Sequence, residues 1–197
     1  VKTNKDDDTN KKVYDKSASL SNATLSPQSF RQGSCYCGKV SIRVTGAPLS
    51  SSICHCSVCR SLTGAPFSVQ SLVSKNNFRC RVVTDASSSD SGEVIEDPEC
   101  HKALWKLATS KNVTRYRCQD CGSPVFGTIG KGRTFVVPHS ILFREGTKDE
   151  MDSTATELFV PTHHMYYLDR IMDIPDKLPK YNGTSQKGRY VLWTGDK

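Results

Sequence analysis

The chain has 197 residues, of which 36% are hydrophobic and 24% are charged, a composition typical of a soluble globular domain. Its formal net charge is +7, from 27 basic and 20 acidic residues. No run approaches the roughly 18 apolar residues of a membrane-spanning helix, so the sequence predicts none. A domain of this size folds without cross-links, and its nine cysteines therefore need a chemical reason.

The change of composition along the sequence predicts one domain between two less structured ends. Residues 1–28 are polar and charged and are expected to form an extension. Residues 29–183 contain short alternating apolar runs separated by Gly, Pro and Ser, which favour a mainly β domain. Residues 184–197 are expected to form a C-terminal tail.

Most of the expected elements are strands. A short helix is expected at 57–62, and the acidic segment 85–99 is expected to be a surface loop. The strands are expected at 39–44, 66–72, 78–84, 103–108, 114–117, 124–129, 134–138 and 157–160.

The N-terminal sequence favours an intracellular protein. Residues 1–16 have no apolar core of the kind that a secretory signal requires. Three Asn-x-Ser/Thr sequons, at Asn22, Asn112 and Asn182, are typical of secreted proteins, but this short pattern also arises by chance in a chain rich in Ser and Thr. We therefore expect a cytoplasmic location, with a nuclear one as the alternative.

Four cysteines have the spacing of a closed zinc site. In a strand, Cys35 and Cys37 would place both sulfurs on one face, about 6.6 Å apart at the backbone. Cys118 and Cys121 are followed by Gly122, which is the turn that tetrahedral zinc repeatedly uses. The two pairs together predict a structural zinc site that contributes on the order of 10 kcal/mol to folding.

A second group, Cys54, Cys56 and Cys59, offers three thiolates within six residues. Three ligands leave a zinc ion one open position, which is typical of catalytic rather than structural sites. Three thiolates also make zinc a good holder of a soft ligand, so the expected substrate is a thiol. His55 is a candidate fourth ligand, but the side chain between two cysteines of an extended segment points to the opposite face, which favours a packing or supporting role.

Two basic stretches surround these cysteines. Residues 17–84 contain no acidic residue, and residues 100–144 contain only Asp120. Such stretches can bind phosphates of nucleic acid, or they can offset thiolate charge and dock an anionic substrate. Seven thiolates on two zinc ions would lower the formal charge from +7 to +4, and few aromatic residues interleave with the basic ones, so nucleic-acid binding is not expected.

The cysteines and histidines allow other interpretations. A secreted disulfide framework with one free thiol is possible in principle, but the close spacings and the size of the domain oppose it. Cys80 and Cys100 are expected to be isolated thiols. Ordinary surface or core roles are expected for the remaining histidines: His101, His139, His163 and His164.

Several motifs together resemble one known family. They are GSCYCGKV at 33–40, CHCSVCR at 54–60, TGAPF at 63–67 and RCQDCGSPVF at 117–126. These motifs closely resemble those of the glutathione-dependent formaldehyde-activating enzyme family, also called the centromere protein V family. The resemblance covers residues 30–183.

The resemblance implies a Mss4-like (β-tent) fold, with antiparallel sheets and few short helices around two zinc sites, one structural and one catalytic. It implies a carbon-sulfur lyase that resembles S-(hydroxymethyl)glutathione synthase and acts on glutathione or another small-thiol adduct. It assigns the structural ion to Cys35, Cys37, Cys118 and Cys121. It assigns the catalytic ion to Cys54, Cys56 and Cys59.

The expected chemistry begins with a substrate thiol that loses its proton at the open zinc position. Arg60 and Lys39 are candidates to bind a glutathione carboxylate, although a basic residue beside thiolates can also serve only to offset their charge. The general acid and the oligomeric state are not identified by the sequence.

Two further interpretations remain open. The domain can be a non-enzymatic zinc module that binds protein or nucleic acid, or a redox or metal-storage thiol protein. A protein side chain as fourth ligand beside Cys54, Cys56 and Cys59 would favour the binding module over the enzyme.

Overall fold

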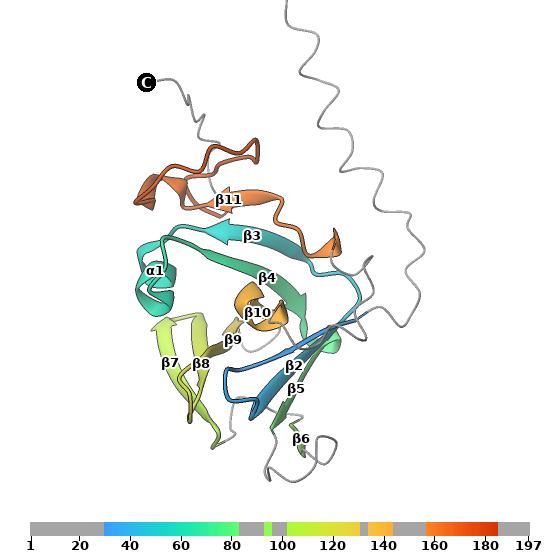
Figure 1. Cartoon of the computed structure of the whole chain (residues 1–197). Helices are drawn as coiled ribbons and strands as arrows, with labels where there is room; N and C mark the ends of the chain where they lie inside the picture. The colour runs from blue at the N-terminus through green and yellow to red at the C-terminus, as the bar shows by residue number, and fades with distance from the viewer. Residues whose placement is uncertain (1–29, 83–92, 96–101, 131–133, 144–156, 185–197) are drawn as a thin grey trace, which may run out of the picture.

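The computed structural model describes residues 30–82, 93–95, 102–130, 134–143 and 157–184 (Figure 1). Its elements in chain order are β1 (Phe30–Ser34), β2 (Val40–Thr45), β3 (Ser50–Cys54), α1 (Ser57–Thr63), β4 (Ser68–Ser74), the 3-10 helix η3 (Lys75–Asn77), β5 (Phe78–Val82), β6 (Glu93–Ile95), β7 (Leu104–Ser110), β8 (Val113–Cys118), β9 (Pro124–Ile129), β10 (Thr134–Pro138), α2 (His139–Leu142), β11 (His163–Met165) and the 3-10 helix η6 (Tyr167–Asp169).

The strands form two sheets. A four-stranded sheet has the order β1-β2-β5-β6, and a seven-stranded sheet has the order β11-β3-β4-β10-β9-β8-β7. Neighbouring strands are antiparallel, except that β11 runs parallel to β3. Figure 1 shows α1 between the ends of β3 and β4 and the pair β7 and β8, so the helix lies at one end of the large sheet.

The core lies between the two sheets. Alternate residues of β2 are buried, as period-two alternation requires of a strand with one face on a core. Phe78 of the small sheet stacks on Phe135 of the large sheet with ring centroids 4.0 Å apart, and it meets the edge of Phe126 at 5.1 Å. These aromatic contacts join the sheets, and the core residues of both sheets form one continuous cluster.

The short helix α2 packs directly against β1. A Cβ atom added to Gly33 would lie 1.8 Å from the backbone oxygen of Ile141, a distance that no side chain can accept. Glycine at this position therefore allows the close approach of strand and helix. Ile141 and Leu142 are both buried there.

This architecture confirms the expected mainly β, Mss4-like fold with few short helices. The strands expected at 124–129 and 134–138 and the helix at α1 are present, and the expected strands from 39–44 to 114–117 are present with ends shifted by a few residues. None of the helices in the described part of the chain is long and apolar enough to span a bilayer. The expected extension 1–28 and residues 185–197 of the expected tail lie outside the described residues.

The strand expected at 157–160 is wrong. Glu157 begins a short helical turn, in which the backbone N–H of Val160 donates to the carbonyl of Glu157 at 3.3 Å. Phe159 is buried and its neighbours are not, so the segment has a single apolar anchor rather than an alternating face. The expectation of a loop over 85–99 is also wrong in part, because β6 lies within that segment.

Candidate metal centres

Cys35 and Cys37 lie in the turn between β1 and β2, not in a strand as expected. Gly38 has φ +80°, and its N–H donates to the carbonyl of Cys35 at 3.0 Å. The N–H of Val40 points at the Sγ of Cys35, 3.2 Å away. A turn brings two sulfurs closer together than the alternating pleat of a strand does, and the two Sγ atoms are 3.5 Å apart.

Cys118 and Cys121 form a second turn of the same kind. Cys118 ends β8, Gly122 has φ +70°, and the N–H of Gly122 donates to the carbonyl of Cys118 at 3.0 Å. The two turns meet through the N–H of Tyr36, which donates to Ser123 Oγ at 3.1 Å. Each pair of sulfurs is therefore held by the backbone of its own turn.

The four sulfurs fit a tetrahedral zinc ion. Their Sγ atoms all lie within 4.8 Å of one another, and Cys37 Sγ is 3.7 Å from Cys118 Sγ. Tetrahedral zinc with sulfur bonds of about 2.3 Å separates its ligands by about 3.8 Å. Burial raises the pKa of Cys35 to about 12, so its thiolate needs a nearby cation. We refer to Cys35, Cys37, Cys118 and Cys121 as the first cluster.

Cys54, Cys56 and Cys59 form the second cluster, with Sγ atoms also within 4.8 Å of one another. Cys54 is the last residue of β3, and its neighbours in the sheet are Ser68 and Met165. Cys56 is the N-cap residue of α1, where its Sγ accepts the N–H of Cys59 at 3.3 Å. The cluster therefore lies at the junction between β3 and α1.

The three sulfurs of the second cluster share negative charge. Hydrogen bonds from the thiols of Cys54 and then Cys59 hold the pKa of Cys56 well below its usual range. The neighbouring thiols thus stabilise one thiolate, that of Cys56. A cation is required to stabilise all three cysteines as thiolates. In the described part of the chain, no fourth His, Cys, Asp or Glu side chain joins this group.

A series of hydrogen-bonded side chains, most of them buried, extends from the C-terminal part of the structure to His55, which lies between two cysteines of the second cluster. His55 Nε2 lies 2.8 Å from His164 Nδ1, and His164 Nε2 lies 2.9 Å from a carboxylate oxygen of Asp176. Lys180 Nζ donates to the same carboxylate at 2.7 Å, and the Lys180 side chain is only 3% exposed. His55 and His164 are fully buried.

The protonation states of these hydrogen-bonded side chains follow from their contacts. Burial lowers the pKa of His164, and burial followed by the nearby His164 lowers the pKa of His55 to about 4, so both rings are neutral. Although burial opposes it, hydrogen bonds from Lys180 and His164 hold the pKa of Asp176 below its usual value. Asp176 therefore accepts the proton of His164 Nε2, and His164 Nδ1 accepts the proton of His55 Nε2.

The two basic residues singled out from the sequence have different positions. Arg60 Nε donates to the carbonyl of His55 at 3.0 Å, so this side chain braces the loop that carries the cysteines. Lys39 forms a 2.6 Å ion pair with Asp120 on the surface beside the first cluster. The binding of a carboxylate by Arg60 stays a prediction.

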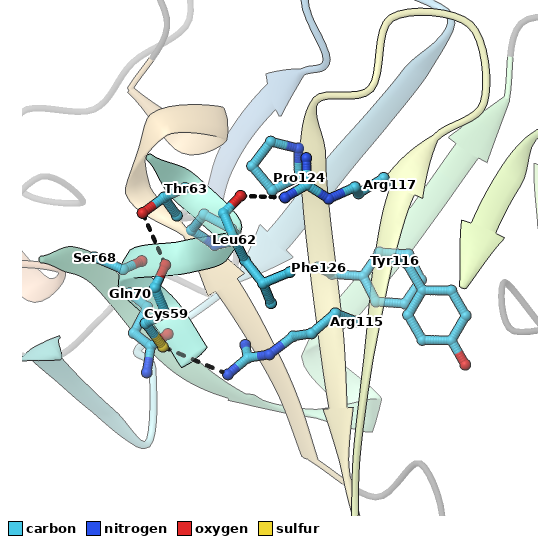
Figure 2. A pocket seen from close by; sticks show the side chains of 11 residues that line it. Cys59, Leu62, Thr63, Ser68, Gln70, Arg115, Tyr116, Arg117, Pro124 and Phe126 are labelled. Atoms are coloured by element: carbon cyan, nitrogen blue, oxygen red, sulfur yellow. Dashed lines mark hydrogen bonds between the residues drawn. The ribbon is translucent and has the colours of Figure 1, made fainter. Parts of the chain in front are cut away.

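A small pocket beside Cys59 contains two arginines that the sequence analysis did not single out (Figure 2). Arg115 Nη2 is 3.8 Å from Cys59 Sγ. Arg117 Nη1 donates to the carbonyl of Gly122 at 3.0 Å, and its Nη2 donates to the carbonyl of Leu62. Arg117 thus connects the end of α1 to a turn of the first cluster. The alternation of Arg115 and Arg117 before Cys118 was the signal available in the sequence.

Cys80 belongs to neither cluster. Cys80 is buried in the core, and burial raises its pKa to about 12, which agrees with the expected isolated thiol. Cys100 lies outside the described residues. All eight cysteines that the structure describes are free thiols, so no disulfide framework forms among them.

Comparison with known proteins shows to which family this chain belongs. The model of the family described as glutathione-dependent formaldehyde-activating enzyme matches residues 30–169. The chain belongs to this family. The matched residues include both cysteine clusters and the strands that carry them, so the resemblance stated from the motifs is confirmed.

Two curated relatives of the formaldehyde-activating family come from Aspergillus flavus and Aspergillus oryzae, each named "Putative glutathione-dependent formaldehyde-activating enzyme". Each is 30% identical to this chain over 110 residues, which cover 54% of this chain and 49% of the relative. The chain thus matches about half the length of these relatives. A crystal structure of a Rhodobacter sphaeroides protein is similar over 60% of this chain and 93% of its own, with 18% identity and a TM-score of 0.40.

Proposed function

We propose that this protein is a zinc-dependent carbon-sulfur lyase that acts on an adduct of glutathione or another small thiol. The family description, glutathione-dependent formaldehyde-activating enzyme, supports glutathione as the thiol. The observation that carries the proposal is the second cluster, which supplies three thiolates and no fourth protein ligand among the described residues. Such a donor set suits a catalytic zinc ion with one position for a soft ligand. The first cluster, with four thiolates, suits the structural ion.

The proposed reaction joins a thiol to an aldehyde. The sulfur of the thiol attacks the carbonyl carbon of the aldehyde, and a carbon-sulfur bond forms. The carbonyl oxygen takes up the proton that the thiol loses. With formaldehyde and glutathione the product is S-hydroxymethylglutathione, and the reverse reaction breaks the same bond. Zinc at the second cluster would supply the positive charge that lowers the pKa of the incoming thiol.

The residues around the second cluster have supporting roles in this proposal. The hydrogen bonds from Asp176 to His164 and from His164 to His55 orient His55, and with it the backbone between Cys54 and Cys56. Arg60 holds the same loop through the His55 carbonyl. These contacts leave the metal ligands little freedom, which is what precise positioning of a thiol beside an aldehyde requires.

The proposed catalytic domain comprises residues 29–183, with an extension before it and a tail after it. The family match over 30–169 and the hydrogen bond from the N–H of Tyr166 to the carbonyl of Gly183 at 3.1 Å support these bounds. The free thiols support a reducing compartment such as the cytoplasm.

The direct test is exchange spectroscopy with carbon-13 formaldehyde, glutathione and the zinc-loaded protein. We expect exchange between free formaldehyde and the glutathione adduct to be faster than the uncatalysed background, and a Cys56→Ser variant to return it to background. A background rate with the native protein, together with tight binding of an oligonucleotide or a partner protein, would replace the enzyme by the zinc-module interpretation.

A further inference from the structure

Arg115 is a charged side chain that contacts the second cluster from a different strand, β8. It extends from β8 toward α1, and its Nη2 is 3.8 Å from the Sγ of Cys59 (Figure 2). Its Nε is shielded from solvent and has no hydrogen-bond partner among the described residues. The guanidinium therefore keeps donor capacity that the surrounding protein does not use.

The path of the Arg115 side chain depends on a glycine in the neighbouring strand. Gly127 of β9 pairs with Arg115 across the sheet. A Cβ atom at Gly127 would lie 3.0 Å from Arg115 Cδ and 3.1 Å from Arg115 Nη1. The arginine thus lies across bare backbone, and a larger residue at position 127 would push it away from Cys59.

Among the residues that the structure describes, none that lines the pocket around Arg115 is an anion that could compete for it. The pocket that Arg115 shares with Cys59 is lined by neutral side chains and one other arginine, Arg117, whose Nη1 and Nη2 already donate to backbone carbonyls. Arg60, on α1, donates its Nε to the His55 carbonyl. The positive charge of Arg115 therefore acts mainly on the sulfurs of the second cluster.

The charge of a loaded second cluster depends on its fourth ligand. Three thiolates with one zinc ion carry −1, and a fourth thiolate makes the centre −2, whereas a neutral ligand leaves it at −1. A second negative charge in a half-buried site is costly unless a cation lies close by. Arg115 can donate a charge-assisted hydrogen bond there, and such bonds are stronger than neutral ones.

We propose that Arg115 is a specificity-determining residue, which makes the second cluster prefer an anionic thiolate over a neutral molecule as its fourth ligand. The inference rests on the proposed function, because it presupposes a thiol substrate at this cluster. Arg115 acts here through its charge and its contact with Cys59, and Gly127 provides the space for that contact.

The experiment uses the cobalt-substituted full chain and two small uncharged probes. 2-Mercaptoethanol binds a metal as a thiolate, whereas imidazole binds as a neutral ligand, and each changes the visible absorption of cobalt. Arg115→Gln should weaken mercaptoethanol binding by about ten- to a hundredfold and leave imidazole binding within about twofold. Arg115→Lys keeps the charge and should retain most of the preference.

The control is Lys106→Gln, which removes one positive charge from the exposed face of the neighbouring strand β7 without contacting the cluster. This variant should bind both 2-mercaptoethanol and imidazole as the native protein does. Circular dichroism and the metal content check that each variant is folded and loaded. Equal weakening of both probes by Arg115→Gln, or no weakening of either, would overturn the inference. Failure of any thiol to bind the native protein would instead contradict the proposed function.

Discussion

The two cysteine clusters differ in what holds their ligands in place. In the first cluster, two backbone turns, each with a glycine at positive φ, set the sulfurs in pairs, and the pairs come from strands that are far apart in the sequence. In the second cluster, all three sulfurs are close in the sequence, and side chains from distant strands brace them. The first cluster therefore ties the fold together, and the second depends on the fold.

This difference fits the proposed division between a structural and a catalytic site. A metal held by β1–β2 and β8–β9 connects the small sheet to the large one, so its loss affects the whole domain. A metal at the β3–α1 junction lies at one end of the large sheet, and its loss affects one loop. Arg117 joins the two regions directly, because it donates hydrogen bonds to the carbonyls of Leu62 and Gly122.

The largest expected effect follows from Cys121→Ser. It removes one of four thiolates from the first cluster and with it much of the folding free energy that a structural zinc supplies, on the order of 10 kcal/mol. We expect loss of the cooperative thermal transition, measured by circular dichroism. A variant that melts like the native protein would show that the first cluster does not stabilise the fold.

Cys56→Ser should leave a folded protein that holds about one metal ion instead of two. The ligand is lost from a loop at the edge of the fold, so the thermal midpoint should fall far less than in Cys121→Ser. Metal analysis beside circular dichroism measures both quantities, and a chelator should strip the same site first from the native protein. Equal collapse of the two cysteine variants would mean that the second cluster is structural too.

A pH titration tests how much one buried histidine outside the clusters contributes to stability. His139 belongs to neither cluster, donates or accepts a hydrogen bond with Ser71 Oγ at 2.8 Å, and has its pKa lowered to about 4 by burial. In the unfolded protein His139 binds a proton near pH 6.5, whereas in the folded protein it does so only near pH 4. The contribution of neutral His139 to the free energy of unfolding is therefore complete above pH 6.5 and is lost as the pH falls toward 4. The loss amounts to roughly 3 kcal/mol at most.

The measurement is the free energy of unfolding by denaturant between pH 7 and pH 4, for the native protein and for His139→Gln. Glutamine can keep a hydrogen bond to Ser71 and cannot titrate. Its curve should therefore be flatter over this range. Parallel curves for the two proteins would show that His139 does not control acid stability.

His164→Phe tests the side-chain brace of the second cluster. Phenylalanine fills a similar volume but accepts no proton from His55 and donates none to Asp176. We expect metal affinity at the second cluster to fall by about ten- to a hundredfold while the first cluster stays loaded. The matched control is His163→Phe, since the His163 ring is also buried but contacts Thr162 and Tyr181 instead. Equal losses in both variants would remove the specific role of His164.

The sequence predicted the parts of the structure that depend on local pattern. The expected strands at 124–129 and 134–138 match β9 and β10, and the cysteine spacings predicted both clusters. β3 was missed because the run from Ser50 to Ser52 has the composition of a loop, although Ser51 and Ser52 are buried within the sheet. Polar residues in a central strand give no alternating signal.

The braces of the second cluster were missed for a different reason. His164 contacts His55 across 109 positions, and Arg115 contacts Cys59 across 56. Only the pairing of β11 with β3, and the passage of β8 beneath α1, bring these residues together. No spacing rule connects them, whereas a metal-ligand spacing connects cysteines in one turn.

The smallest expected effect belongs to Lys39→Ala, a residue that the sequence analysis offered as a partner of the glutathione carboxylate. Lys39 and Asp120 form an ion pair on the surface, where water screens both charges, and the pair lies on the turns that carry the first cluster. We expect no measurable change in the thermal midpoint and none in thiol binding to the cobalt-substituted protein. Arg60→Ala, in contrast, removes the hydrogen bond to His55 and should weaken thiol binding. If Lys39→Ala weakened thiol binding as much as Arg60→Ala, the substrate would extend to the first cluster, and the separation between a structural and a chemical region would fail.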